Sequence, residues 1–397
     1  MPESILRRGF LATLAAGVAA AQERPFDIVI RNGEVRDPAR KFRGKADVGI
    51  RDGRIAAIEN AIPPERGLEV IDAAGLYVTP GLVDLHTHCY HSATTIGIEA
   101  DPIAARSGVT TWVDAGTFGY AQTPGFRRWI VNPAQVRIYG FVYLYMDNRN
   151  PDDDATRYIR RQMKATGETA VRNRDILLGV KVQVGSNMSG RYSPEIFQIA
   201  RELCDEFKLP LMAHISFAPP ETDRVMEQMR PGDVVTHCYN THTLGILDAS
   251  GKVRSSVRDA RSRGVRFDIG HGSGSFNFEV ARKALGDGFP PDTISTDVYS
   301  LNVNGPVYDM PTTMSKMLAL GMSFDDVLER STFAPARIVN RLEGMGTLAA
   351  GSPADVALLA IEEGDFQLID SQRNTMRVKR RIVSRATICR GRRVLVL

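Results

Sequence analysis

Eight short apolar runs of β-type composition recur through the middle of the chain, and helical stretches such as 194–207 and 257–263 separate most of them. The runs are 82–86, 109–114, 137–144, 177–184, 210–215, 233–237, 265–269 and 293–295. Eight βα units within about 260 residues predict a (β/α)8 TIM barrel in an α/β protein. A doubly wound sheet is the alternative. Such a sheet usually has a glycine-rich phosphate-binding loop after its first strand, whereas the glycine-rich stretch here, from Gly270 to Gly274, follows the seventh run.

The two ends of the chain differ from the middle in pattern: they contain short strand-like runs joined by tight turns rather than by helical stretches. Asn32-Gly33 and Asp52-Gly53 are hairpin signals, and apolar residues alternate with basic ones between Arg377 and Arg393. Neither end is long enough to bury a core alone. We therefore expect 22–79 and 340–397 to pair into one small β-sandwich domain, with 80–339 forming the barrel.

The first 21 residues resemble a twin-arginine secretion signal. Arg7 and Arg8 precede a short apolar stretch that ends in an A-x-A site at Ala19 to Ala21. The stretch is too short to span a bilayer comfortably. This pattern predicts cleavage before Gln22 and a periplasmic or secreted protein without a membrane anchor, and a cytoplasmic protein is the alternative.

Charge and cysteine content exclude some functional classes. The formal net charge is only +4 for 397 residues, and the basic residues near the C-terminus alternate with Val, Ile and Leu. That alternation indicates strands with a solvated basic face rather than a nucleic-acid site. The four cysteines are far apart and form no C-x-x-C pair, so we expect free thiols.

Polar residues occupy the ends of five of the eight runs. They are His86 and His88 after the first, Lys181 in the fourth, His214 in the fifth, His237 in the sixth and Asp297 after the eighth. Side chains two apart in a strand face the same way, and a barrel gathers its functional groups at the carboxyl ends of its strands. A lysine inside an apolar strand is costly unless it is paired or neutralised. The set therefore predicts a metal site.

With these residues in place, the chain resembles the amidohydrolase superfamily. The motifs are Pro80-Gly81-Leu82-Val83-Asp84-Leu85-His86-Thr87-His88 and the closing Gly351-Ser352-Pro353-Ala354-Asp355-Val356. The resemblance implies two divalent metal ions, with zinc favoured and Mn, Fe or Co left open. It assigns His86, His88 and Asp297 to one ion and His214 and His237 to the other. Lys181, carboxylated by CO2, would bridge the two.

The resemblance also implies a mechanism. A hydroxide shared by the two ions would attack a polarised carbonyl, and Asp297 would take its proton and pass it to the leaving group. Lys181 and Asp297 are thus the expected catalytic residues. An inactive metal-binding scaffold is a remote alternative, but all six ligand positions are occupied here.

Within that superfamily, the stretches 233–240, 267–276 and 292–297 look like a dihydroorotase-related deacetylase branch. Its members remove acyl groups from small α-substituted carboxylates, including acetylated hydroxy acids. Dihydroorotases usually carry an arginine where this chain has Tyr90, which counts against that activity. Deaminase relatives usually carry a glutamate soon after the residue that matches His214, and this chain has none there. An N-acyl-D-amino-acid deacylase, a dihydroorotase-like cyclic amidase and a dipeptidase remain alternatives.

Four further residues are candidates for contacts with a small carboxylate substrate. His271 ends the seventh run, Tyr239 and Asn240 follow a predicted ligand, and Arg191 lies on the loop after the fourth run. Strand alternation should point Cys89 and Cys238 away from the metals, and no G-x-S-x-G element indicates a serine hydrolase. Relatives of this kind also make a homo-oligomer possible.

Overall fold

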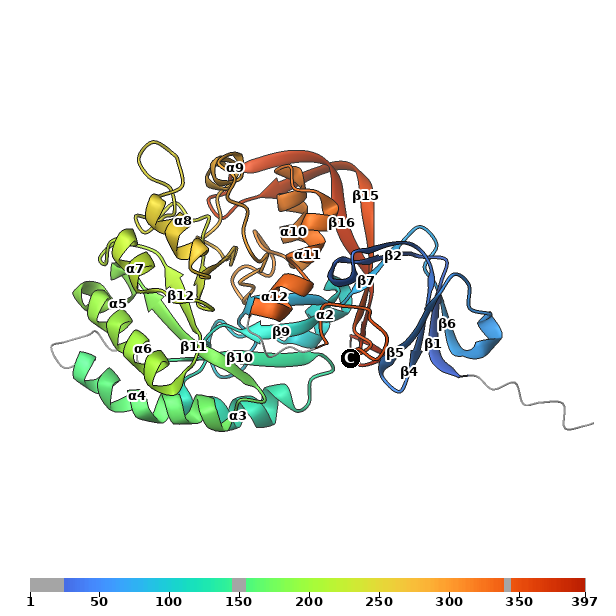
Figure 1. Ribbon diagram of the computed structural model, residues 1–397, viewed down its shortest axis with the longest axis horizontal. Coiled ribbons are helices and arrows are strands. Elements are labelled where there is room, and N and C mark those ends of the chain that lie inside the picture. Colours follow the sequence, from blue (N-terminus) through green and yellow to red (C-terminus); the bar gives the residue numbers. More distant parts are fainter. Residues whose placement is uncertain (1–24, 145–154, 339–343, 397) are drawn as a thin grey trace, which may run out of the picture.

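The computed structural model describes residues 25–144, 155–338 and 344–396, and Figure 1 shows their arrangement. A parallel sheet with helices around it makes up the larger part. Strands from both chain ends lie together on one side of it. The predicted signal, residues 1–21, lies outside the described residues. None of the described helices combines the length and apolar character needed to cross a bilayer.

Seven parallel strands form the central sheet, in the order β14-β13-β12-β11-β10-β9-β8. Their bounds agree with the first seven predicted runs to within one residue at each end: β8 (Leu82–Thr87), β9 (Val109–Asp114), β10 (Arg137–Tyr143), β11 (Leu177–Val184), β12 (Leu211–Ile215), β13 (Val234–Thr236) and β14 (Arg266–Asp268). Because neighbouring strands are parallel and consecutive in the chain, their carboxyl ends meet at one edge of the sheet.

The eighth predicted strand, 293–295, is wrong as a strand. The segment makes only isolated parallel bridges, from Thr293 to Asp268 of β14 and from Val298 to Thr87 of β8. Its side chains explain the difference, since Thr293 donates to the Asp268 carboxylate and Thr296 to that of Asp84. Segment 293–298 therefore bridges the two edge strands through polar side chains and scattered backbone bonds instead of a regular ladder.

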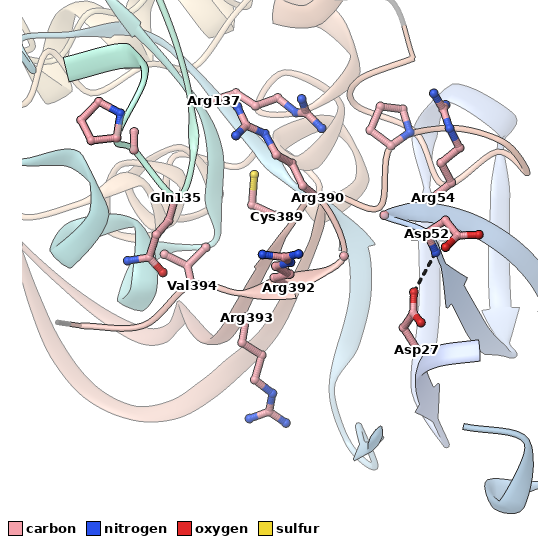
Figure 2. A pocket seen from close by; sticks show the side chains of 15 residues that line it. Asp27, Asp52, Arg54, Gln135, Arg137, Cys389, Arg390, Arg392, Arg393 and Val394 are labelled. Carbon is pink, nitrogen blue, oxygen red and sulfur yellow. Dashed lines mark hydrogen bonds between the residues drawn. The ribbon is translucent and has the colours of Figure 1, made fainter. Parts of the chain in front are cut away.

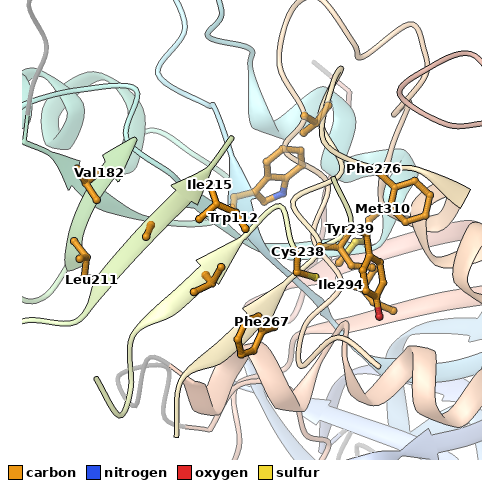
Figure 3. Packing of buried hydrophobic residues seen from close by; sticks show 14 of the residues in the cluster. Trp112, Val182, Leu211, Ile215, Cys238, Tyr239, Phe267, Phe276, Ile294 and Met310 are labelled. Carbon is orange, nitrogen blue, oxygen red and sulfur yellow. The ribbon is translucent and has the colours of Figure 1, made fainter. Parts of the chain in front are cut away.

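Helices pack around the sheet with their apolar faces inward. Figure 3 shows part of this core, where Trp112 of β9 and Phe267 of β14 lie among aliphatic side chains. The helices of six residues or more are α2 (Ala100–Ser107), α4 (Ala155–Arg172), α6 (Ser193–Phe207), α7 (Thr222–Gln228), α8 (Ser255–Ser262), α9 (Phe278–Gly286), α10 (Met310–Ala319), α11 (Phe324–Glu329) and α12 (Phe333–Ile338). Shorter turns are η1 (Pro38–Arg40), η2 (Pro64–Arg66), η3 (Tyr120–Gln122), α3 (Thr123–Phe126), η4 (Arg127–Val131), α5 (Ser186–Ser189) and η5 (Gly190–Tyr192).

Side-chain caps fix where several of these helices begin, including α9 and α10. The Asn277 carboxamide accepts the amides of Glu279 and Val280 at the start of α9. The Asp309 carboxylate accepts the amide of Thr312 at the start of α10. Such caps satisfy helix amides that have no partner within the helix.

Both chain ends contribute to one β domain, as predicted. A four-stranded sheet has the order β5-β4-β1-β6, and a six-stranded sheet the order β17-β16-β15-β7-β2-β3. The strands are β1 (Phe26–Arg31), β2 (Glu34–Asp37), β3 (Phe42–Lys45), β4 (Asp47–Arg51), β5 (Arg54–Glu59), β6 (Gly67–Asp72), β7 (Tyr77–Pro80), β15 (Val356–Ile369), β16 (Thr375–Cys389) and β17 (Arg392–Arg393). Ile30 and Val48 of the first sheet share a buried core with Val78 and Val356 of the second.

The hairpin of β15 and β16 is long enough to leave the β domain and run along α10 (Figure 1). Leu368 and Ile382 are buried in the core of the larger part. At the tip, the buried Asp370 carboxylate accepts the amides of Phe278, Gln372 and Asn374. The hairpin tip is thereby attached to the start of α9.

A groove of about 990 Å³ lies between the β domain and the parallel sheet (Figure 2). Five arginines line it: Arg54, Arg137, Arg390, Arg392 and Arg393. Arg137 is paired with the buried Asp355 at 2.7 Å, whereas Arg390 and Arg392 are exposed, as the alternating pattern predicted. None of the predicted metal ligands lines this groove.

Candidate metal centre

His86 and His88 lie at the carboxyl end of β8 and face the same point. Their Nε2 atoms are 3.4 and 3.1 Å from Oδ1 of Asp297. Asp297 has a left-handed backbone conformation, with φ of 49°, in the segment that bridges β14 and β8. The alternation within β8 and the turn at Asp297 thus bring together residues that are far apart in the chain.

His237 completes a compact group with His86 and Asp297. It follows β13 directly and also has a positive φ, 69°. One ligand atom from each of the three residues lies within 4.8 Å of the other two, and all three residues are buried. Two imidazoles and one carboxylate at this spacing suit a divalent metal ion.

Lys181 and His214 lie against this group. The Lys181 Nζ atom is 3.2 Å from Nε2 of His86, and the ring centres of His214 and His237 are 4.2 Å apart. The fold therefore brings all six predicted ligands to the carboxyl edge of the parallel sheet, from β8, β11, β12, β13 and the bridging segment.

Three of the four imidazoles are oriented by a bond to Nδ1. Nδ1 of His86 lies 2.8 Å from the Thr236 hydroxyl, and Nδ1 of His88 lies 2.8 Å from that of Thr117. Nδ1 of His237 donates to the carbonyl of Gly270 at 2.6 Å. With Nδ1 engaged, Nε2 is the atom left to bind a metal, and such outer bonds fix the ring's tautomer and direction.

Buried carboxylates support this arrangement from behind. Asp268 accepts hydrogen bonds from the hydroxyls of Thr236, Thr293 and Ser295 at 2.6–2.7 Å. Asp114 accepts the amide of Thr117 at 2.7 Å. Sequence reasoning missed these supporting residues because a threonine or aspartate in an apolar run carries no local signal of its distant partner.

The electrostatics keep three of the imidazoles in the form that binds metals. Burial lowers the pKa of His86 and of His214 well below the usual value, and that of His237 to about 4. Burial also lowers the pKa of Lys181 to about 8, partly opposed by the nearby carboxylate of Asp297. Neutral imidazoles are ligands and a neutral amine is a nucleophile, whereas their protonated forms are neither.

One buried atom is left without a hydrogen bond. Oδ1 of Asp297 is inaccessible to solvent, and no donor of suitable geometry reaches it among the described residues. A buried carboxylate oxygen in this state is costly unless a cation neutralises it. The residues present thus fit a metal ion, which would neutralise the unpaired Oδ1 atom of Asp297.

Two glycines allow the close packing around the ligands. Gly270 and Gly272 both have positive φ, at 47° and 53°. A Cβ atom on Gly272 would lie 2.3 Å from Oδ2 of Asp297, and one on Gly270 would lie 2.9 Å from Nδ1 of His237. Only glycine leaves room for the ligands at these positions.

The four candidate substrate contacts have other partners in the structure. Tyr239 is fully buried and donates to the Phe289 carbonyl at 2.9 Å, in the core that Figure 3 shows. Asn240 is bonded to backbone groups, including the carbonyl of His237 at 2.7 Å. His271 is fully buried against Lys316, and the exposed Arg191 donates to the Tyr192 hydroxyl. Their role in substrate binding stays a prediction.

The cysteines behave as expected. All four are free and buried. Burial raises the pKa of the Cys89 and Cys238 thiols well above the usual value, although both adjoin a ligand. A thiol that stays protonated is a poor nucleophile, so neither suits covalent catalysis.

Comparison with known proteins identifies the family. The model of the amidohydrolase family matches residues 77–394. The chain belongs to the amidohydrolase family. This confirms the resemblance inferred from the sequence motifs and makes the chain a hydrolase with a buried metal-binding group.

Individual relatives agree with this assignment. A deacetylase of Agrobacterium fabrum is 35% identical over 334 residues, which are 83% of this chain and 81% of that protein. A deacetylase of Enterococcus faecalis is 32% identical over 369 residues, 92% of this chain and 98% of that protein. The crystal structure of an adenine deaminase is similar with a TM-score of 0.85 at 32% identity, covering 93% of this chain and 99% of that one.

Proposed function

We propose that this amidohydrolase holds two divalent metal ions and removes an acetyl or related acyl group from small α-substituted carboxylates. The observation that carries the proposal is the convergence of six candidate ligands, four of them buried, around an Asp297 oxygen that has no hydrogen bond among the described residues. The deacetylase relatives support the choice of reaction within the family.

The ligand set divides into two groups. His86, His88 and Asp297 would hold one ion, and His214 and His237 the other. The nitrogen and oxygen donors favour zinc. When bound, the ions would make water nucleophilic at neutral pH and polarise the scissile carbonyl.

Lys181 supplies the bridging ligand in this proposal. Its neutral amine attacks CO2, a nitrogen–carbon bond forms, and one proton leaves the nitrogen. The resulting carbamate is an anion that offsets part of the dications' charge. Burial favours this step because it lowers the pKa of Lys181 to about 8, so that a substantial share of the amine is neutral near pH 7 to 8.

Asp297 moves the proton. Its carboxylate accepts a proton from the attacking water as the new bond to the acyl carbon forms. The same carboxyl group then donates that proton to the leaving oxygen or nitrogen, which gives acetate and the free α-substituted acid. The turn at Gly272 packs against this carboxylate so closely that it leaves no room for a Cβ atom.

The wider predictions from the sequence belong to the same proposal. Segment 293–298 would complete a (β/α)8 barrel within residues 80–339, and residues 1–21 would direct export. His271, Tyr239, Asn240 and Arg191 remain the candidate substrate contacts. A deacylase of N-acyl-D-amino acids, a cyclic amidase and a dipeptidase differ from the favoured function in substrate alone.

A substrate panel tests the proposal. Zinc-reconstituted residues 22–397 would be assayed for proton release with O-acetyl hydroxy acids, N-acetyl D- and L-amino acids, dipeptides and cyclic imides. Adenine would be assayed for ammonia release. Turnover of the O-acetyl acids that disappears in Asp297→Asn, with both metals retained, is the expected result. Turnover confined to adenine, or unchanged in Asp297→Asn, would overturn it.

A further inference from the structure

Lys316 and His271 form a buried pair of basic side chains outside the ligand set. Both are fully buried, and Nζ of Lys316 lies 2.7 Å from Nε2 of His271. Nδ1 of His271 donates to the carbonyl of Gly272 at 2.9 Å, so Nε2 accepts from the lysine. Burying a lysine beside a histidine costs free energy, so a pair of this kind points to a structural or functional task.

The lysine joins two loops that flank the candidate metal centre. It lies on α10, and its amine also donates to the carbonyl of Pro306 at 2.8 Å. Pro306 belongs to the loop that follows Asp297, and His271 to the loop that follows β14. A single amine thus ties together the loop after β14 and the loop after Asp297.

The turn that carries His271 is in direct contact with Asp297. Gly272 donates its amide to the carbonyl of Thr296 at 3.0 Å, next to Asp297 in the chain. The Cα atom of Gly272 is packed so closely on the Asp297 carboxyl group that no Cβ would fit. Any displacement of the turn therefore displaces that carboxylate or opens a gap beside it.

The hairpin tip also contacts the same turn. The Ser371 hydroxyl lies 3.1 and 2.9 Å from the carbonyls of His271 and Gly272. It also accepts the amide of Phe276, whose ring stacks on His271 with centres 4.6 Å apart. The turn from Gly270 to Gly272 is thus held by hydrogen bonds from both the β15–β16 hairpin and α10.

We propose that Lys316, with Ser371, is a positioning residue that sets the location of the Asp297 carboxylate through the turn from Gly270 to Gly272. The inference deepens the proposed hydrolytic function and rests on it. Lys316 is not one of the six candidate ligands; it acts through His271. Residues that orient ligands from outside the metal shell typically affect metal affinity or activity by about 10–100-fold.

The experiment compares Lys316→Met with Lys283→Met, which removes a lysine that is half exposed on α9. Methionine keeps the length of the side chain but donates no hydrogen bond. We expect kcat of Lys316→Met to fall about 10–100-fold while KM and two bound metals per chain are retained. The visible absorption spectrum of the cobalt-substituted protein should change in Lys316→Met and remain that of the wild type in Lys283→Met.

Ser371→Ala provides a second variant, should Lys316→Met fail to fold. It should change kcat and the cobalt spectrum in the same direction, to a smaller extent. A wild-type cobalt spectrum with full kcat per metal-loaded chain, in whichever variant folds, would overturn the proposal. A loss of kcat explained wholly by a smaller folded or metal-loaded fraction would overturn it too. Because the spectrum needs no substrate, it tests the positioning role even if every panel substrate is inert.

Discussion

Thr236 connects His86 to Asp268 through one hydroxyl group. The hydroxyl donates to Oδ2 of Asp268 at 2.7 Å, and its oxygen lies 2.8 Å from Nδ1 of His86. The hydroxyl's single proton goes to the carboxylate, so Nδ1 of His86 carries the proton on the other side. The Nε2 lone pair of His86 is thereby directed at the ligand group, as a metal ligand requires.

Thr236→Val should weaken metal binding by about 10–100-fold, because valine has the same shape but can neither accept from His86 nor donate to Asp268. Chelator competition on the zinc-loaded protein measures the affinity. Thr236→Ser keeps the hydroxyl and should bind zinc nearly as the wild type does. Equal affinities in the valine and serine variants would show that the relay does not orient His86.

Gly272→Ala should reduce kcat by about 100-fold, because a misplacement of about 1 Å has such an effect on a catalytic group. The new Cβ would lie 2.3 Å from Oδ2 of Asp297, at a residue whose φ is 53°. Gly274→Ala is the matched control, since a Cβ there meets nothing within 4 Å. If the two variants have equal kcat, the turn does not constrain the carboxylate.

Lys181→Ala should lose the bridging ligand and with it most of the bound metal and the activity. Millimolar acetate or propionate should restore part of both, because a small carboxylate can occupy the space that the lysine leaves. Metal content after gel filtration, with and without the added acid, measures this. A Lys181→Ala protein that keeps two metals and full turnover would exclude a carbamate bridge.

The stability of the protein should depend on pH through Lys316. Burial lowers its pKa to about 7 from the usual 10.5. Between these values the unfolded chain binds more protons than the folded one, so the free energy of unfolding rises with pH. Relative to Lys316→Met, the wild type should gain stability from about pH 7 to pH 10, with a slope of at most about 1.4 kcal/mol per pH unit.

Below about pH 7 both states carry the charged lysine, and the difference between the two proteins should be constant. Thermal unfolding at a series of pH values measures that difference. A difference that does not change between pH 7 and pH 10 would mean that the lysine is not forced towards neutrality by burial.

The sequence singles out the candidate ligands because five of them lie at or just after the end of an apolar run, and the sixth, Lys181, lies within one. Alternation within β8 aligns His86 with His88, and parallel strands bring His214 and His237 to the same edge. These are local patterns with a known spatial consequence. The eighth run was misjudged since it is short and its Thr and Ser side chains bond to buried carboxylates, which a pattern of apolar residues does not reveal.

The supporting residues could not be predicted in the same way. Thr236 and His86 are 150 positions apart, and Lys316 and His271 are 45 apart. Only the fold shows that they meet. Tyr239 illustrates the opposite case, because its place beside a ligand in the chain suggested a substrate contact, whereas its ring lies in the core and its hydroxyl binds Phe289.

Anomalous diffraction from crystals of the zinc- and bicarbonate-reconstituted protein tests the central claim most directly. The account predicts two zinc peaks about 3.5–4 Å apart, among His86, His88, His214, His237 and Asp297, with density for a carbamate continuous with Nζ of Lys181. A single peak, peaks away from these side chains, or an unmodified Lys181 beside two ions would contradict it.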